Sequence, residues 1–117
     1  TPTIVRRDGE TRWVIGTPGG STIITTVFQI LVHVIDFELP LADAVALRRI
    51  HHQWAPDLVY LERGEVYGQD CLDRLAAMGH TFGERGPIGD VQAIEVLPDG
   101  GLRGVSDPRG QGEAVGR

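Results

Sequence analysis

The sequence predicts an α+β fold in which antiparallel β-sheet is packed against helices. Three observations lead to this prediction. Hairpin patterns occur near both ends of the chain, a long apolar helix lies between them, and strands and helices alternate without regular βαβ units. With 117 residues the chain has room for one domain, residues 1–117, built around a single modest core.

The first predicted elements form a β-hairpin. Residues 3–5 and 12–16 are strand-like, and Asp8-Gly9 between them is typical of a tight turn. Residues 17–21 then read Thr-Pro-Gly-Gly-Ser, which predicts a loop. Because glycine has no Cβ, the backbone of this loop can come close to another group.

A long helix is expected to begin at about Ser21, with Ser21 as its N-cap. Its apolar side chains cover most of its circumference, so we expect it to be buried on two sides, between a sheet and another layer. His33 lies among them and is expected to be a hydrogen-bonded core histidine. The apolar positions are Ile23, Ile24, Val27, Phe28, Ile30, Leu31, Val34 and Ile35.

Shorter elements follow in the second half. A helix over residues 41–47 comes after Pro40, and residues 51–54 and 58–61 are strand-like around an Ala-Pro-Asp turn.

An amphipathic helix is predicted over residues 69–78 and ends before Gly79. We expect the apolar side of this helix to face inward, with Cys71 as a small core residue. The inward side chains are Leu72, Leu75, Ala76 and Met78. A second hairpin then joins residues 91–97 to residues 102–105.

Composition and charge exclude several functions. The net charge is −5, and the eleven basic residues are all arginines, scattered along the chain rather than clustered. Nucleic acid is therefore not an expected partner. No apolar run reaches the roughly 18–20 residues that cross a bilayer, and the single cysteine makes no internal disulfide.

The Gly19-Gly20 pair is the chemically informative feature. It stands between a strand and the start of the long helix. The first amides of a helix have no intrahelical partners, and the helix dipole adds positive potential there. Such a site suits an anion or a developing oxyanion. Taken alone, however, the pair also fits a tight strand-to-helix connection.

Several further motifs surround the glycine pair. They are Thr1-Pro2-Thr3-Ile4-Val5, Gly16-Thr17-Pro18-Gly19-Gly20-Ser21, Ile24-Thr25-Thr26, the Arg49-to-Asp57 stretch RIHHQWAPD, Gly79-His80, Gly89, Val91-Gln92-Ala93-Ile94 and Ser106-Asp107-Pro108-Arg109. Several separate motifs in register are more specific than any single one. In their order and spacing, from Thr1 to the last few residues, they resemble the small subunit of the γ-glutamyltranspeptidase family.

The resemblance implies an N-terminal nucleophile hydrolase fold, an αββα sandwich of two antiparallel sheets between helical layers. It implies that the backbone amides of Gly19 and Gly20 form the catalytic oxyanion hole and contact the substrate. The implied reaction is γ-glutamyl transfer from glutathione or a related amide to water, an amino acid or a peptide. It proceeds through a threonyl acyl-enzyme, with no metal and no cofactor.

The family's nucleophile is a threonine freed at the N-terminus of the small subunit, and its α-amine serves as the base. Thr1-Pro2-Thr3 does not match that motif, which begins with two threonines. It matches instead the segment after the family's paired serines, which grip the substrate carboxylate. We therefore expect Thr1 to mark the boundary of a C-terminal small-subunit segment that lacks the nucleophile and is inactive alone.

The implied partners are the rest of the small subunit, the large subunit and a small γ-glutamyl substrate. The cellular compartment stays open between a periplasmic or secreted location, which the resemblance favours, and the cytoplasm.

Other polar residues have structural interpretations. Adjacent histidines on a strand point to opposite faces, so His51-His52 is not expected to bind a metal. Asp107 is expected to cap a turn and to pair with Arg109. Arg48-Arg49 favourably opposes the dipole of the preceding helix. Trp13 and Trp54 are expected to be core residues.

Two alternatives remain at this stage. The first is a related acylase of the same fold that acts on another amide, such as a poly-γ-glutamate or a β-lactam side chain. The second is a non-catalytic module that self-associates through exposed sheet edges, which tend to pair with another chain.

Overall fold

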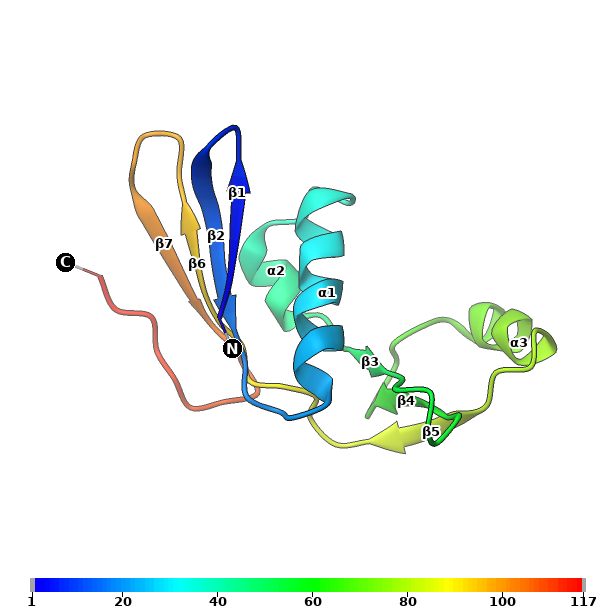
Figure 1. Cartoon of the computed structure of the whole chain (residues 1–117). Helices are drawn as coiled ribbons and strands as arrows, with labels where there is room; N and C mark the ends of the chain where they lie inside the picture. Colours follow the sequence, from blue (N-terminus) through cyan, green and yellow to red (C-terminus); the bar gives the residue numbers. More distant parts are fainter. Residues whose placement is uncertain (1, 117) are drawn as a thin grey trace.

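The computed structural model describes residues 2–116, so Thr1 and its predicted role lie outside the described residues. The larger of two sheets has four antiparallel strands in the order β1-β2-β6-β7 (Figure 1). It combines hairpins from opposite ends of the sequence, and both predicted hairpins are confirmed. The strands are β1 (Thr3–Arg7), β2 (Glu10–Gly16), β6 (Gln92–Val96) and β7 (Leu102–Ser106).

Two features set the register of this sheet. Asp8 and Gly9 have φ angles of 54° and 85°, the left-handed conformation that a two-residue hairpin turn requires. Strands β2 and β6 then join the hairpins by pairing Ile15 with Ala93 and Gly16 with Gln92. The start of β6 therefore lies beside the end of β2, where the glycine loop begins.

Helices α1 (Thr22–Ile35) and α2 (Leu41–Ala46) cover one face of this sheet (Figure 1). The side chains between them and the sheet form the hydrophobic core, as the α+β prediction requires. Trp13, Leu31, Leu39 and Val105 pack around its margin. The buried core residues are Ile15, Val27, Ile30, Val34, Leu41, Ala44, Val45, Val91 and Ala93.

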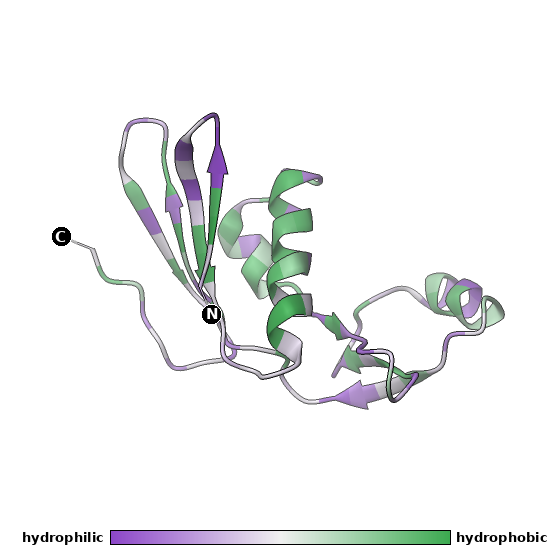
Figure 2. Ribbon diagram, viewed as in Figure 1, coloured by the Kyte–Doolittle hydropathy of each residue, from purple (hydrophilic) through white to green (hydrophobic). Residues whose placement is uncertain are grey.

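The prediction that α1 is buried on two sides is wrong for the part of the chain that the structure describes. Its outer face is apolar but open to solvent (Figure 2). Ile24 is 79% exposed, Phe28 64% and Ile35 51%. These three residues, which we call the outer face of α1, recur at helical spacing and lie opposite the core.

The smaller sheet contains β3 (Ile50–His51), β4 (Val59–Glu62) and β5 (Phe82–Arg85). Strands β4 and β5 are parallel, and α3 (Gln69–Ala77) connects them, so the prediction that every strand pair is antiparallel is wrong here. No sequence signal predicts β5, because its residues Phe-Gly-Glu-Arg show no apolar alternation.

Three further expectations fail near this sheet. Residues 52–54 are not in a strand, and Trp54 is 82% exposed rather than part of the core. Helix α3 has no buried residue among those described, and Met78 is 75% exposed. Cys71 is only partly buried. The helix end is confirmed, since Gly79 has a φ of 99°.

Within the described residues, no helix is both long and apolar enough to cross a membrane.

The outer face of α1 leads to the first testable prediction. Because exposed apolar patches tend to bind other surfaces, we expect the isolated chain to self-associate. Ile24→Glu or Phe28→Glu should shift the population towards monomer, as measured by size-exclusion chromatography with light scattering. Val115→Glu is the matched control, since Val115 is 83% exposed but lies far along the chain, in the C-terminal tail.

A wild-type chain that stays monomeric over the whole concentration range would contradict this prediction. Association that persists in the Ile24 and Phe28 variants would assign it to the open edges β1 and β7 instead.

Candidate functional site

The predicted glycine site lies in the loop between β2 and α1 (Figure 1). Gly19 has a φ of 136° and Gly20 a φ of 59°, values that favour glycine. A Cβ on Gly19 would also collide with the Thr22 hydroxyl, whereas the space beside Gly20 is open. The loop therefore requires glycine for its backbone angles at both positions and for lack of space at Gly19.

The carbonyl groups of the loop are held by threonines. The Thr17 hydroxyl donates to the Pro18 carbonyl at 2.8 Å. The Gly19 carbonyl accepts from the Thr22 amide at 3.2 Å and from the Thr22 hydroxyl at 3.0 Å. Within residues 2–116, the amide N–H groups of Gly19 and Gly20 donate no hydrogen bond. Two backbone donors thus remain free at the start of α1.

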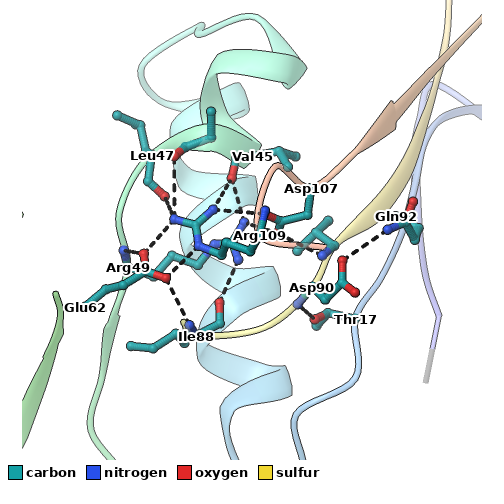
Figure 3. Close-up of polar contacts among 12 residues, drawn as sticks. Thr17, Val45, Leu47, Arg49, Glu62, Ile88, Asp90, Gln92, Asp107 and Arg109 are labelled. Carbon is teal, nitrogen blue, oxygen red and sulfur yellow. Dashed lines mark hydrogen bonds and ion pairs between the residues drawn. The ribbon is translucent and has the colours of Figure 1, made fainter. Parts of the chain in front are cut away.

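A second loop, residues 86–91, contacts the glycine loop. The Asp90 amide donates to the Thr17 hydroxyl at 2.9 Å (Figure 3). Gly89 has a φ of 76°, and a Cβ there would lie 2.9 Å from that same hydroxyl and 3.0 Å from Thr26 Cγ2. The backbone at Gly89 therefore packs directly against Thr17 and α1.

Ser21 stands at the N-cap position of α1, as expected, but it does not cap the helix with its side chain. Ser21 already has helical angles, φ −63° and ψ −23°, and its side chain makes no cap hydrogen bond. Thr22 bonds to the Gly19 carbonyl instead.

The electrostatics at this end of α1 favour negative charge. The first turn of α1 contains no acidic residue, so the helix dipole is not offset by a nearby carboxylate on the helix. An open groove of about 550 Å³ begins at Gly20 and runs along α1. Free amides, positive potential and access from solvent together suit an anion or an oxyanion.

A buried ionic cluster contacts the Ile88–Val91 segment (Figure 3). It consists of Arg49, Glu62, Asp107 and Arg109. Arg109 binds Glu62 through two nitrogens, each at 2.6 Å, and Asp107 at 3.0 Å. Arg49 binds Asp107 at 2.7 Å and the Val45 carbonyl at 2.6 Å. The Arg49 and Asp107 side chains are 2% and 0% exposed.

The cluster also holds backbone next to the glycine loop. The Val91 amide donates to Asp107 at 2.8 Å, and the Ile88 amide donates to Glu62 at 3.0 Å. Arg49 in turn donates to the Ile88 carbonyl at 2.6 Å. The segment that packs against Thr17 is therefore fixed at both ends by buried charges.

The expected pairing of Asp107 with Arg109 is confirmed, and so is the capping role of Asp107, which accepts from the Arg109 amide at 3.0 Å. Arg49 donates to the Val45 carbonyl in the last turn of α2, as expected of a charge that opposes the dipole of that helix, and it is in addition buried and paired with Asp107.

Hydrogen bonding keeps both acids of the cluster ionised. Burial alone would raise the pKa of Asp107, but donation from the Val91 and Arg109 amides and from both guanidinium groups outweighs it and lowers that pKa. Burial alone would also raise the pKa of Glu62. Hydrogen bonds from the Arg109 side chain and from the Ile88 and Arg49 amides outweigh burial, so this pKa is lowered as well.

The histidines have separate structural partners. His51 is buried, with Nδ1 2.8 Å from the Thr25 hydroxyl and Nε2 2.9 Å from Gln53 Oε1. His52 contacts Asp57 at 3.0 Å. The two rings therefore have different partners, and only His51 lies in a strand, β3.

His33 differs from expectation, since its buried Nδ1 has no partner among the described residues. Burial and the nearby charge of Arg49 lower its pKa, so the ring is neutral.

Comparison with known proteins shows the family of the chain. A family model for gamma-glutamyltranspeptidase matches residues 1–117. The chain belongs to the γ-glutamyltranspeptidase family. Glutathione hydrolase proenzymes of Pseudomonas aeruginosa and Escherichia coli are 47% and 48% identical over 115 and 109 residues, or 96% and 93% of this chain.

The chain spans only about a fifth of these relatives, 20% and 18% of their lengths. Among solved structures, a γ-glutamyltranspeptidase of Pseudomonas nitroreducens complexed with L-DON has 46% identity and a TM-score of 0.88. The similarity extends over all of this chain and over 61% of the Pseudomonas nitroreducens chain. The predicted N-terminal nucleophile hydrolase fold and α+β class are thereby confirmed.

Sequence reasoning missed Thr17 and Thr22 as parts of the site. A usable signal was present, since a threonine lies two residues before the glycine pair and another two residues after it.

The buried cluster yields a stability prediction. Asp107→Ala would leave Arg49 buried without its carboxylate, so we expect it to lower the free energy of unfolding by about 3–5 kcal/mol. Glu84→Ala is the control, because Glu84 and Arg63 form an ion pair with side chains 63% and 78% exposed. Its loss should cost no more than about 1 kcal/mol. Urea denaturation measures both, and equal effects would contradict the prediction.

The lowered pKa values predict a dependence on pH. In the unfolded state Glu62 and Asp107 have ordinary pKa values of 4.5 and 3.8, so they take up protons at a higher pH than in the folded state. The stability that these carboxylates contribute is therefore present at neutral pH and is lost progressively below about pH 5. Denaturation curves between neutral and acid pH should show this fall, and Glu62→Gln should make it shallower. A stability that rises on acidification would refute the assignment.

Proposed function

We propose that this chain supplies the oxyanion hole of an enzyme that transfers γ-glutamyl groups to water, an amino acid or a peptide. The observation that carries the proposal is the pair of free amides at Gly19 and Gly20, at the start of a helix without acidic residues in its first turn. The glutathione hydrolase relatives, at 47% and 48% identity, support glutathione or a similar γ-glutamyl amide as donor.

In the proposed reaction, a threonine outside this chain attacks the γ-glutamyl carbonyl carbon. The carbon–oxygen π bond opens, and negative charge develops on the oxygen. The Gly19 and Gly20 amides donate hydrogen bonds to that oxygen and lower the energy of the tetrahedral intermediate. The carbon–nitrogen bond then breaks, the amine leaves with a proton, and a threonyl ester remains.

Water or an amine then attacks the ester carbonyl, and the same amides stabilise the second tetrahedral intermediate. Collapse of this intermediate breaks the carbon–oxygen bond of the ester and releases the threonine hydroxyl. We further propose that the partners of this chain are the rest of a small subunit and a large subunit, because the relatives are about five times longer.

A related acylase is the second candidate. The transpeptidase CapD of Bacillus anthracis has the same fold, with 25% identity and a TM-score of 0.84. The much higher identity to the glutathione hydrolases favours the γ-glutamyl amide.

A hybrid enzyme tests the proposal. In it, this chain replaces the matching 115 residues of the Pseudomonas aeruginosa glutathione hydrolase. We expect the hybrid to hydrolyse a γ-glutamyl anilide and the isolated chain to show no turnover, because the proposed nucleophile is a threonine outside it. Gly20→Ala should lower kcat by about 10-fold or more with little change in KM. The substitution strains the backbone and displaces the amide, which weakens stabilisation of the transition state but not binding of the substrate.

Gly9→Ala is the matched control. Gly9 also has a positive φ, 85°, and open space beside it, but it lies in the β1–β2 turn. The same backbone strain should therefore leave kcat unchanged. Equal activity of the Gly20→Ala and Gly9→Ala hybrids would sink the oxyanion-hole assignment, and turnover by the isolated chain would overturn the claim that the nucleophile lies elsewhere.

A further inference from the structure

We infer that Thr17 and Thr22 are positioning residues that aim the Gly19 and Gly20 amides at the reacting oxygen. The inference rests on the proposed function and extends it from the glycines to the side chains that hold them. Both threonines are buried, at 6% and 2% exposure, although the glycines between them are exposed.

One peptide unit joins each carbonyl to the amide of the following residue. A trans peptide is planar, so the carbonyl of one residue and the N–H of the next point in opposite directions. Any group that fixes the Pro18 carbonyl therefore fixes the direction of the Gly19 N–H. A group that fixes the Gly19 carbonyl fixes the Gly20 N–H in the same way.

The first of these units is held by Thr17. Its hydroxyl donates to the Pro18 carbonyl at 2.8 Å and accepts from the Asp90 amide at 2.9 Å (Figure 3). The Thr17 hydroxyl thus donates its one proton to the glycine loop and accepts a hydrogen bond from the Ile88–Val91 segment, which the ionic cluster fixes. The Gly89 backbone packs so closely against this hydroxyl that no Cβ fits between them without displacement.

The second unit is held by Thr22. Its amide and its hydroxyl both donate to the Gly19 carbonyl, at 3.2 and 3.0 Å. The hydroxyl also occupies the space that a Cβ on Gly19 would need. A threonine is suited to this task because its branched Cβ restricts χ1, and in a helix its hydroxyl can bond a carbonyl three or four residues earlier, as Thr22 does with Gly19.

These contacts compensate for a property of glycine. Glycine has more backbone freedom than any other residue, which works against a site that must be ordered before the reaction. Oxyanion stabilisation depends on donors that are already oriented when charge develops. The two hydroxyls restore the order that the glycines lack.

Thr26 provides a matched control in the same helix. It is fully buried, like Thr22, but its hydroxyl has no hydrogen-bond partner among the described residues. Replacement by valine, which has the same shape, therefore removes a hydroxyl without removing a contact to the glycine loop.

The test uses the hybrid enzyme and measures kcat and KM for a γ-glutamyl anilide. Thr17→Val and Thr22→Val should each lower kcat by roughly 10- to 100-fold, with KM within about threefold, because misaimed donors affect the transition state more than substrate binding. Thr17→Ser and Thr22→Ser retain the hydroxyl and should keep kcat within about threefold of the parent. Thr26→Val should match the parent.

Several results would overturn the inference. They are a parental kcat in both valine variants, serine variants as impaired as the valine ones, or an effect confined to KM. If a valine variant does not fold, the serine variants decide, since a merely structural loss of packing would impair them as well. Loss of kcat in Gly20→Ala but not in Thr17→Val or Thr22→Val would reject this inference alone and leave the proposed function standing.

Discussion

The buried ionic cluster is the interaction on which the rest of the structure depends. Its charges are stable away from water only because each is paired and hydrogen-bonded at the same time. Asp107 joins Arg49 and Arg109 and also binds the Val91 amide, while Glu62 binds Arg109 and the Ile88 amide. Helix α2 and both sheets therefore meet at one point, and the backbone between Ile88 and Val91 has little freedom to move.

The constraint continues from this cluster to the glycine loop. Asp90 lies between the two fixed amides, and its own amide binds the Thr17 hydroxyl, which binds the Pro18 carbonyl. In the proposed site, the buried charges thus help to orient a backbone donor through the Asp90 amide and the Thr17 hydroxyl. Such support is what a preorganised oxyanion hole requires, because donors that must reorient during the reaction stabilise charge less well.

Local patterns predicted what depends on local physics. The Asp8-Gly9 turn, the span of α1 and the end of α3 at Gly79 all follow from nearby residues. The environment of Arg49 could not be predicted in this way, because its partner Asp107 is 58 residues away. The predicted burial of Trp54 and of the outer face of α1 was wrong for a different reason. Apolar character predicts burial only where other residues cover the side chain, and the described residues do not cover these side chains. The glycine pair was recognised from its motif, but the threonine hydroxyls that hold it emerged only from the structure.

The position of the reacting oxygen relative to the two glycine amides can be tested directly by a crystal structure. We predict that a crystal structure of the hybrid enzyme, trapped with an inhibitor that forms a tetrahedral adduct on the nucleophile, will place the adduct oxygen roughly 2.7–3.1 Å from the amide nitrogens of both Gly19 and Gly20. An oxygen that points away from both amides, or that is held by other groups while the loop keeps its present conformation, would contradict the account.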